Sequence, residues 1–101
     1  MRMLVNVSFP VETFNAAVRD GSSGNKIKKI LEQLKPEAAY FMARNGQRTA
    51  VLIIDLPDAS KIPTIAEPWF LQFNAAIEMH PVMTPQDLGN AGLDGLGKQW
   101  S

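Results

Sequence analysis

The feature that most constrains the fold is the segment Tyr40–Leu56, in which two apolar runs flank the dipeptide Asn45-Gly46. Asn-Gly between such runs is a strong signal of a β-hairpin, because both residues tolerate the positive φ that a tight turn requires. The second run, Ala50–Ile54, is apolar at every position, which is typical of a strand that is buried on both faces. Such a strand needs a cover on each side of its sheet.

Hydrophobic periodicity predicts the remaining elements. Apolar residues recur at every second position over Met3–Phe9, which indicates a strand with one apolar face. After Pro10 apolar residues follow helical spacing as far as Leu34, with an interruption at Gly21–Gly24. The other predicted elements are strands at Ala38–Arg44, Thr49–Leu56 and Asn74–Val82 and a second helix at Lys61–Phe70.

Two prolines place further constraints on these elements. Pro68 should bend or end the second helix, because an internal proline lacks the N–H of the helical hydrogen bond and clashes with the preceding turn. Pro81 lies within the fourth strand, and proline in a sheet is confined almost entirely to edge strands, strand ends and bulges. The fourth strand is therefore predicted to be an edge strand.

The segment from Thr84 onward predicts a helical tail. Thr84 can cap a helix, and Asp87 stands where the reciprocal carboxylate of a capping box would be. Leucines and Trp100 give this tail a weak apolar side, but its glycines each cost a helix up to about 1 kcal/mol relative to alanine. We therefore expect the tail to dock on its own subunit or on a partner.

The order of elements predicts an α+β fold. Strand, helix, strand, strand, helix, strand is the ferredoxin-like βαββαβ pattern, with a four-stranded antiparallel sheet, here followed by a C-terminal helix. In this pattern the first and third strands are central. The chain is expected to form a single domain over residues 1–101, with residues 84–101 as the helical tail. Two helices cover one face of the sheet, so a second copy of the chain is expected to cover the other.

Composition excludes several classes of protein. Ten basic and ten acidic residues balance, so the chain carries no electrostatic footprint for nucleic acid. There is no cysteine and one histidine, which leaves no pattern of metal ligands, and no cofactor is expected. The polar Asn6 comes too early for a signal peptide, and no apolar stretch is long enough to span a membrane. These observations predict a cytoplasmic protein that binds neither membranes nor nucleic acid.

The element order, the end of the fourth strand (Glu78–Met83) and the capped tail (Thr84–Leu88) carry a resemblance to a known superfamily. On these features the chain resembles the dimeric α/β-barrel superfamily, which includes muconolactone isomerases and antibiotic-biosynthesis-type monooxygenases. The resemblance implies a homodimer whose two sheets pack face to face, with a cleft in each subunit. If the protein is an enzyme, it further implies cofactor-independent isomerisation or oxygenation. The break at Gly21–Gly24 departs from the simplest version of the pattern.

His80 and Glu78 are the candidate catalytic residues. His80 is the only histidine, and Glu78 shares its side of the fourth strand because side chains alternate along a strand. A carboxylate beside an imidazole orients it as a proton acceptor. Asn6, on the neighbouring first strand, is a candidate contact to substrate. The alternative interpretation is a polar pair on an edge strand, or a hydrogen bond across a dimer, with no catalytic role.

Three further residues are candidate ligand contacts. Arg44 can bind a carboxylate through two hydrogen bonds, and Tyr40 on the same side of the second strand can donate another. The alternative is that Arg44 only keeps the rim of the sheet soluble. Trp69 can line an aromatic pocket, fill the core or anchor a dimer.

Two hypotheses for function follow from these residues. The first is a homodimer with a pocket for a small organic ligand, either apolar or carboxylate-bearing, that acts as an isomerase or monooxygenase-like enzyme. The second is a non-catalytic structural or interaction protein, in which the two sheet faces are only core and dimer interface. The sequence leaves both hypotheses, and the substrate, open.

Overall fold

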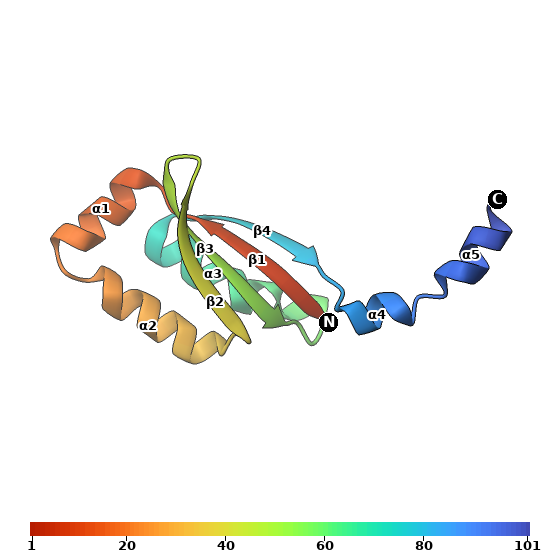
Figure 1. Cartoon of the computed structure of the whole chain (residues 1–101). Coiled ribbons are helices and arrows are strands. Elements are labelled where there is room, and N and C mark those ends of the chain that lie inside the picture. Colours follow the sequence, from red (N-terminus) through yellow and green to blue (C-terminus); the bar gives the residue numbers. More distant parts are fainter.

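The computed structural model describes all 101 residues and is an α+β fold, in which helices cover one face of a four-stranded antiparallel sheet (Figure 1). The elements in chain order are β1 (Arg2–Ser8), α1 (Val11–Arg19), α2 (Ser23–Leu34), β2 (Ala38–Arg44), β3 (Gln47–Asp55), the 3-10 turn η1 (Ala59–Lys61), α3 (Ile62–Phe73), β4 (Ala76–Pro81), α4 (Pro85–Gly89) and α5 (Leu93–Gln99). The predicted α+β class is confirmed.

The strands lie in the order β2-β3-β1-β4, and each neighbouring pair is antiparallel. β1 and β3 are therefore central, and β4 is an edge strand, as the sequence predicts. The N–H of Val82 after Pro81 donates to the carbonyl of Arg2 on β1 at 3.0 Å, so the nitrogen of Pro81 itself faces away from β1 and its missing N–H costs the sheet no internal hydrogen bond. The order and pairing are compatible with a ferredoxin-like fold.

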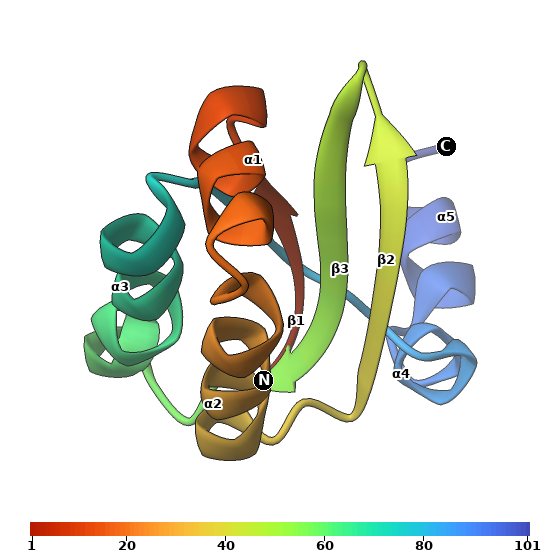
Figure 2. The same ribbon diagram turned by 90° about the vertical axis from the view of Figure 1, so that its left-hand side faces the viewer.

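The hydrophobic core lies between the sheet and the layer formed by α1, α2 and α3 (Figure 2). Alternate residues of β1 and β3, including Val5 and Leu52, point into it and are fully buried. The rings of Phe9 and Phe73 meet edge to face with their centroids 5.1 Å apart. Burial of each large apolar side chain contributes roughly 1.5–3 kcal/mol, so this layer accounts for most of the stabilisation of the fold.

No helix of the chain covers the other face of the sheet, which we call the open face. Val51 and Ile53 point to this face from the central strand β3 and are only half-buried, whereas their neighbours Leu52 and Ile54 are buried in the core. The apolar run at Ala50–Ile54 therefore has one covered and one uncovered side within a single chain.

The hairpin between β2 and β3 has the expected turn. Asn45 and Gly46 have φ values of 53° and 74°, and these two residues alone connect the strands. β3 consequently begins at Gln47 rather than at Thr49, because a two-residue turn leaves Gln47 free to pair with Arg44.

The sequence predicts that Pro68 bends or ends the second helix, with the helix spanning Lys61–Phe70, and the helix does not end at the proline. α3 continues through Pro68 and ends at Phe73, where Asn74 adopts φ 53°. Trp69 and Phe73 are both fully buried in the core, and both depend on the helix continuing past the proline. Tertiary packing on this side of α3 outweighs the hydrogen bond that Pro68 removes.

The tail forms two short helices, α4 and α5, instead of one, because Gly92 between them adopts φ 73°. We call Thr84–Ser101 the C-terminal arm. It extends past the end of the sheet at which β1 begins (Figure 1), and every residue from Pro85 onward is exposed. The chain measures 59 × 28 × 19 Å, with a radius of gyration of 17.0 Å. A compact chain of this length has a radius of about 13 Å, so the arm makes the molecule markedly elongated.

None of the helices is both long enough and apolar enough to cross a lipid bilayer.

Candidate functional site

Strand register arranges the open face as three rows that each cross all four strands. The rows are Ala38–Ile53–Leu4–His80, Tyr40–Val51–Asn6–Glu78 and Met42–Thr49–Ser8–Ala76. Of the six residues that the sequence nominates, Asn6, Tyr40, Glu78 and His80 thus lie on this face, and Arg44 follows on the same side of β2. The structure places these five on one face, where Arg44 contacts Asn6 and His80 contacts Glu78, and it places Trp69 on the other side of the sheet.

Glu78 and His80 form a pair on the edge strand. Nε2 of His80 lies 3.5 Å from Oε2 of Glu78, and the two side chains are 62% and 74% exposed, respectively. An exposed pair of this kind contributes at most about 1 kcal/mol to stability. The contact holds Nε2 toward the carboxylate and leaves Nδ1 of the imidazole without a partner in the chain.

Asn6 is the buried polar centre of the open face. Its side chain is nearly inaccessible to solvent, and its Nδ2 donates to Oγ of Ser8 at 3.4 Å. Nη1 of Arg44 donates to Oδ1 of Asn6, also at 3.4 Å. Arg44 therefore reaches from β2 across β3 to β1. A guanidinium has five N–H donors, so it keeps donors available after this single long hydrogen bond.

The surroundings of this polar group are mostly apolar. Leu4, Val51 and Ile53 form a half-buried floor, and Tyr40 stands at one side with 67% of its surface exposed. A few convergent polar groups set in an apolar surface are the usual composition of a small-molecule site. In a single chain this surface is open rather than enclosed.

Trp69 lies on the other side of the sheet. It is fully buried in the core, 5.9 Å from Phe9 between ring centroids, and its indole Nε1 has no hydrogen-bond partner. The helical spacing of Trp69 and Phe73 indicates a shared face of α3, but the sequence does not say which face of the sheet that helix covers. Its predicted contact with a ligand would have to occur away from the other five residues.

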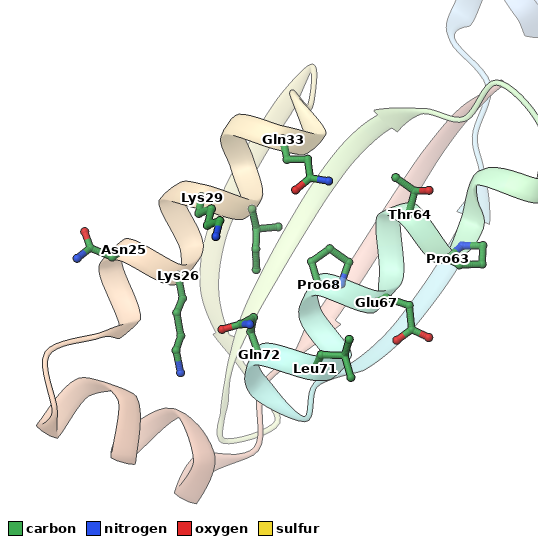
Figure 3. A pocket seen from close by; sticks show the side chains of 11 residues that line it. Asn25, Lys26, Lys29, Gln33, Pro63, Thr64, Glu67, Pro68, Leu71 and Gln72 are labelled. Carbon is green, nitrogen blue, oxygen red and sulfur yellow. The ribbon is translucent and has the colours of Figure 1, made fainter.

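Sequence reasoning missed a groove between α2 and α3, with a volume of about 600 Å³ (Figure 3). Lys26 and Lys29 line the α2 side, and Thr64 and Pro68 line the α3 side. Pro68 has no N–H to donate to the carbonyl of Thr64 four residues earlier, so that carbonyl lacks its helical partner. The spacing of Lys26 and Lys29, three residues apart beside the apolar Ile30, was the signal available in the sequence.

A second hollow of about 390 Å³ lies beneath the hairpin and is mainly apolar. Its lining residues are Phe9, Phe14, Phe41, Met42, Ala43, Arg48 and Thr49. The guanidinium of Arg48 lies 4.7 Å from the ring centroid of Phe14 and hydrogen bonds to Asn15 at 2.8 Å. Arg48 thus closes part of this hollow and is already engaged by the fold.

Charged groups cluster where the arm leaves the sheet. Nε of Arg2 lies 3.0 Å from a carboxylate oxygen of Glu37, and this hydrogen bond raises the pKa of the arginine. In the capping box of α4, the backbone N–H of Thr84 donates to Asp87 at 2.9 Å and lowers the pKa of that carboxyl group. These contacts define the start of the arm.

No three His, Asp or Glu side chains of the chain lie close enough together to hold a metal ion. The side chains of the open face offer an imidazole, a carboxylate, a guanidinium, an amide and hydroxyls for chemistry. Such a set can bind an anion and transfer a proton.

A scan of the chain against models of known protein families gives no match, and a search among curated proteins finds no similar sequence. The architecture is compatible with a ferredoxin-like fold, and the chain is a small α+β protein with a four-stranded antiparallel sheet.

Proposed function

We propose that this protein binds a small organic molecule on the open face of its sheet, in a pocket that is completed when two copies pack sheet to sheet. The observation that carries the proposal is the buried Asn6 at the centre of an apolar face, in contact with Arg44 and in register with Glu78. Burial of an amide is unfavourable unless its hydrogen bonds are satisfied, and the bonds to Asn6 are long. A ligand between the two sheets would complete them.

The chemistry of the face favours a ligand with an apolar body and a carboxylate. Leu4, Val51 and Ile53 would contact the apolar body, and Tyr40 would donate a hydrogen bond. Arg44 has a planar arrangement of donors that matches the two oxygens of a carboxylate. A ligand of this class would fit the polar and apolar parts of the face at the same time.

If the protein is an enzyme, His80 acts as the proton acceptor. Glu78, with Oε2 3.5 Å from Nε2 of His80, would orient the imidazole so that the lone pair of Nδ1 takes a proton from an acidic carbon of the substrate. The electron pair of the broken C–H bond moves into an enolate, whose oxygen Arg44 would stabilise. Return of the same proton to a different carbon isomerises the substrate without a cofactor.

One observation favours the alternative, a non-catalytic interaction protein. Both members of the Glu78–His80 pair are more than half exposed, which is ordinary for an edge strand with no chemical role. In that case the open face is only a dimer interface, and its polar residues serve to align the two sheets.

Ligand binding and dimerisation are tested on the same set of variants. Native mass spectrometry of the purified protein looks for a co-purified small molecule, and thermal shift compares benzoate with its uncharged analogue benzamide. We expect benzoate to stabilise the wild type more than benzamide does, and Arg44→Ala to remove that difference. Lys28→Ala, an exposed charge change on α2, is the matched control.

His80→Ala separates the two hypotheses. For a ligand pocket, this variant weakens binding or turnover while light scattering still finds a dimer and the Tm is nearly unchanged. A large fall in Tm, with no change in the response to any ligand, would favour the interaction protein. A monomer at micromolar concentration would remove the proposed pocket altogether.

A further inference from the structure

The C-terminal arm carries apolar side chains that nothing in its own chain covers. Leu93 and Leu96 of α5, together with Trp100, which directly follows the helix, have i, i+3, i+7 spacing, and Trp100 is 78% exposed. Leu88 of α4 is exposed as well. Exposed tryptophan on a regular apolar stripe is typical of a surface that is covered in an assembly.

The helices of the arm need such a cover to persist. An isolated helix shorter than about 12–15 residues is marginal in water, and α5 has seven residues, of which Gly95 and Gly97 are poor helix formers. The start of the arm is nevertheless well defined, because Thr84 and Asp87 form a reciprocal capping box. The arm thus begins at a well-defined capped helix and continues into a helix that is weak on its own. This combination is typical of a segment that becomes stable when it packs against another surface.

The arm lies on the side of the sheet that the helices leave uncovered. In Figure 2, α1 and α2 lie in front of the sheet, whereas α4 and α5 lie behind it. In Figure 1 the same two helices extend past the ends of the strands, so they do not cover their own open face. The arm therefore runs in the layer that a second copy stacked on the open face would occupy.

The size of the open face supports a contribution from the arm. Three rows of four side chains form the face. A stable interface involves roughly 20–30 residues on each side, so the sheet alone is too small. Adding the arm of each copy brings the interface into that range.

The edge strand β2 offers an apolar surface for the arm. Tyr40 and Met42 point to the open face and are exposed, at 67% and 43%. An exposed apolar edge strand is a liability that proteins usually cover. Met42 lies between Tyr40 and Arg44 on this side of β2, and Tyr40 is in register with Val51 and Asn6.

We propose that the arm of each copy crosses to the second copy and packs with Leu93, Leu96 and Trp100 against Tyr40 and Met42. Each copy then supplies the apolar cover of the other copy's ligand site, which is incomplete without it. This inference rests on the sheet-to-sheet dimer of the proposed function. It adds that the arm is exchanged and that Trp100 is a residue of the partner's site.

Tryptophan fluorescence tests the cover directly. Subtracting the spectrum of Trp100→Phe from that of the wild type isolates Trp100, since Trp69 is buried in both proteins. When the protein concentration is raised so that monomers form dimers, we expect the emission of Trp100 to shift to the blue and its quenching by acrylamide to fall several-fold. The dimer is followed in parallel by light scattering.

A mixing experiment distinguishes an exchanged arm from one that folds back on its own chain. The chain has no cysteine, so Met42→Cys can be labelled with bimane in a copy that also carries Trp100→Phe. Mixed in dilute solution with excess wild type and then concentrated, this copy should lose bimane fluorescence, because only a wild-type arm supplies Trp100. Bimane at Leu71→Cys, exposed on α3 in the helical layer, is the control and should not be quenched.

Each outcome has a defined meaning. Shielded Trp100 together with quenching at position 42 supports the exchanged arm. A dimer in which Trp100 stays exposed overturns the arm exchange and leaves the sheet-to-sheet dimer standing. If Trp100 is shielded but added wild type does not quench bimane at position 42, the proposed contact is overturned. Equal quenching of bimane at positions 42 and 71 overturns it as well. A monomer at all concentrations overturns both the arm exchange and the proposed pocket.

Discussion

Nη1 of Arg44 on the edge strand β2 lies 3.4 Å from Oδ1 of Asn6 on β1, and the bond between them passes over the central strand β3. The two residues are far apart in the sequence and come from strands that do not pair. Their contact joins an exposed cation to the one buried amide of the open face. It is the most specific polar arrangement on that surface.

Replacement of Arg44 by alanine should separate binding from stability. The arginine is exposed and its bond to Asn6 is long, so the free energy of unfolding should change by no more than about 0.5 kcal/mol. Affinity for benzoate should fall, because the carboxylate loses its bidentate partner. Urea denaturation and titration calorimetry measure the two effects. Loss of more than about 2 kcal/mol of stability with unchanged affinity would show that Arg44 is structural.

Replacement of Trp69 should lower the stability of the fold, because this side chain lies in the hydrophobic core. The side chain is 0% exposed, so Trp69→Ala should destabilise the fold by about 3–5 kcal/mol. Trp69→Phe should cost less, because the indole Nε1 makes no hydrogen bond that would be lost. Urea denaturation of the two variants checks this order. A weakened ligand response in a stable Trp69→Phe protein would instead support the predicted ligand contact of this residue.

The two glycines Gly46 and Gly24 should respond to alanine in opposite ways. Gly46 adopts φ 74° in the hairpin turn, a conformation that costs an L side chain roughly 1–2 kcal/mol, so Gly46→Ala should destabilise. Gly24 lies in α2 with no positive φ and with open space around its missing Cβ. Gly24→Ala should therefore stabilise by up to about 1 kcal/mol. If Gly46→Ala and Gly24→Ala change the Tm by the same amount, the positive φ of Gly46 in the hairpin turn would be contradicted.

The capping box of α4 should weaken at low pH. The pKa of Asp87 is lowered from its usual 3.8 by the N–H of Thr84, so the folded arm favours the ionised carboxylate. Its stabilising contribution is complete above the usual pKa and is lost as the pH falls through the lowered value. An NMR titration of residues 84–89 should show this transition below pH 3.8.

Asp87→Asn provides the control for this titration. The amide does not ionise over this range, so the acid transition of residues 84–89 should disappear. A transition that persists in the variant would mean that another group controls the start of the arm.

Local rules were sufficient for most of the sheet. Strand alternation placed Glu78 with His80 and Tyr40 with Arg44, because side chains repeat every two residues, and the element order placed the first strand, which carries Asn6, beside the fourth. The Asn45-Gly46 turn and the Thr84–Asp87 capping box are likewise confirmed, since each depends on a few neighbouring residues. The dimer, the ligand and the catalytic role of His80 stay predictions.

The sequence by itself thus determined the strands, their order and which residues of each strand share a side, because these follow from periodicity and short connections. Only the tertiary structure decided the features that depend on distant partners. α3 continues through Pro68 because Trp69 and Phe73 are held in a core that local propensity does not describe. The bond between Arg44 and Asn6 needs two strands brought to either side of a third. The arm projects from the sheet, and its apolar residues pack against no other part of the chain. The residue pattern of the arm does not predict this, because it depends on which surfaces the rest of the fold leaves within reach.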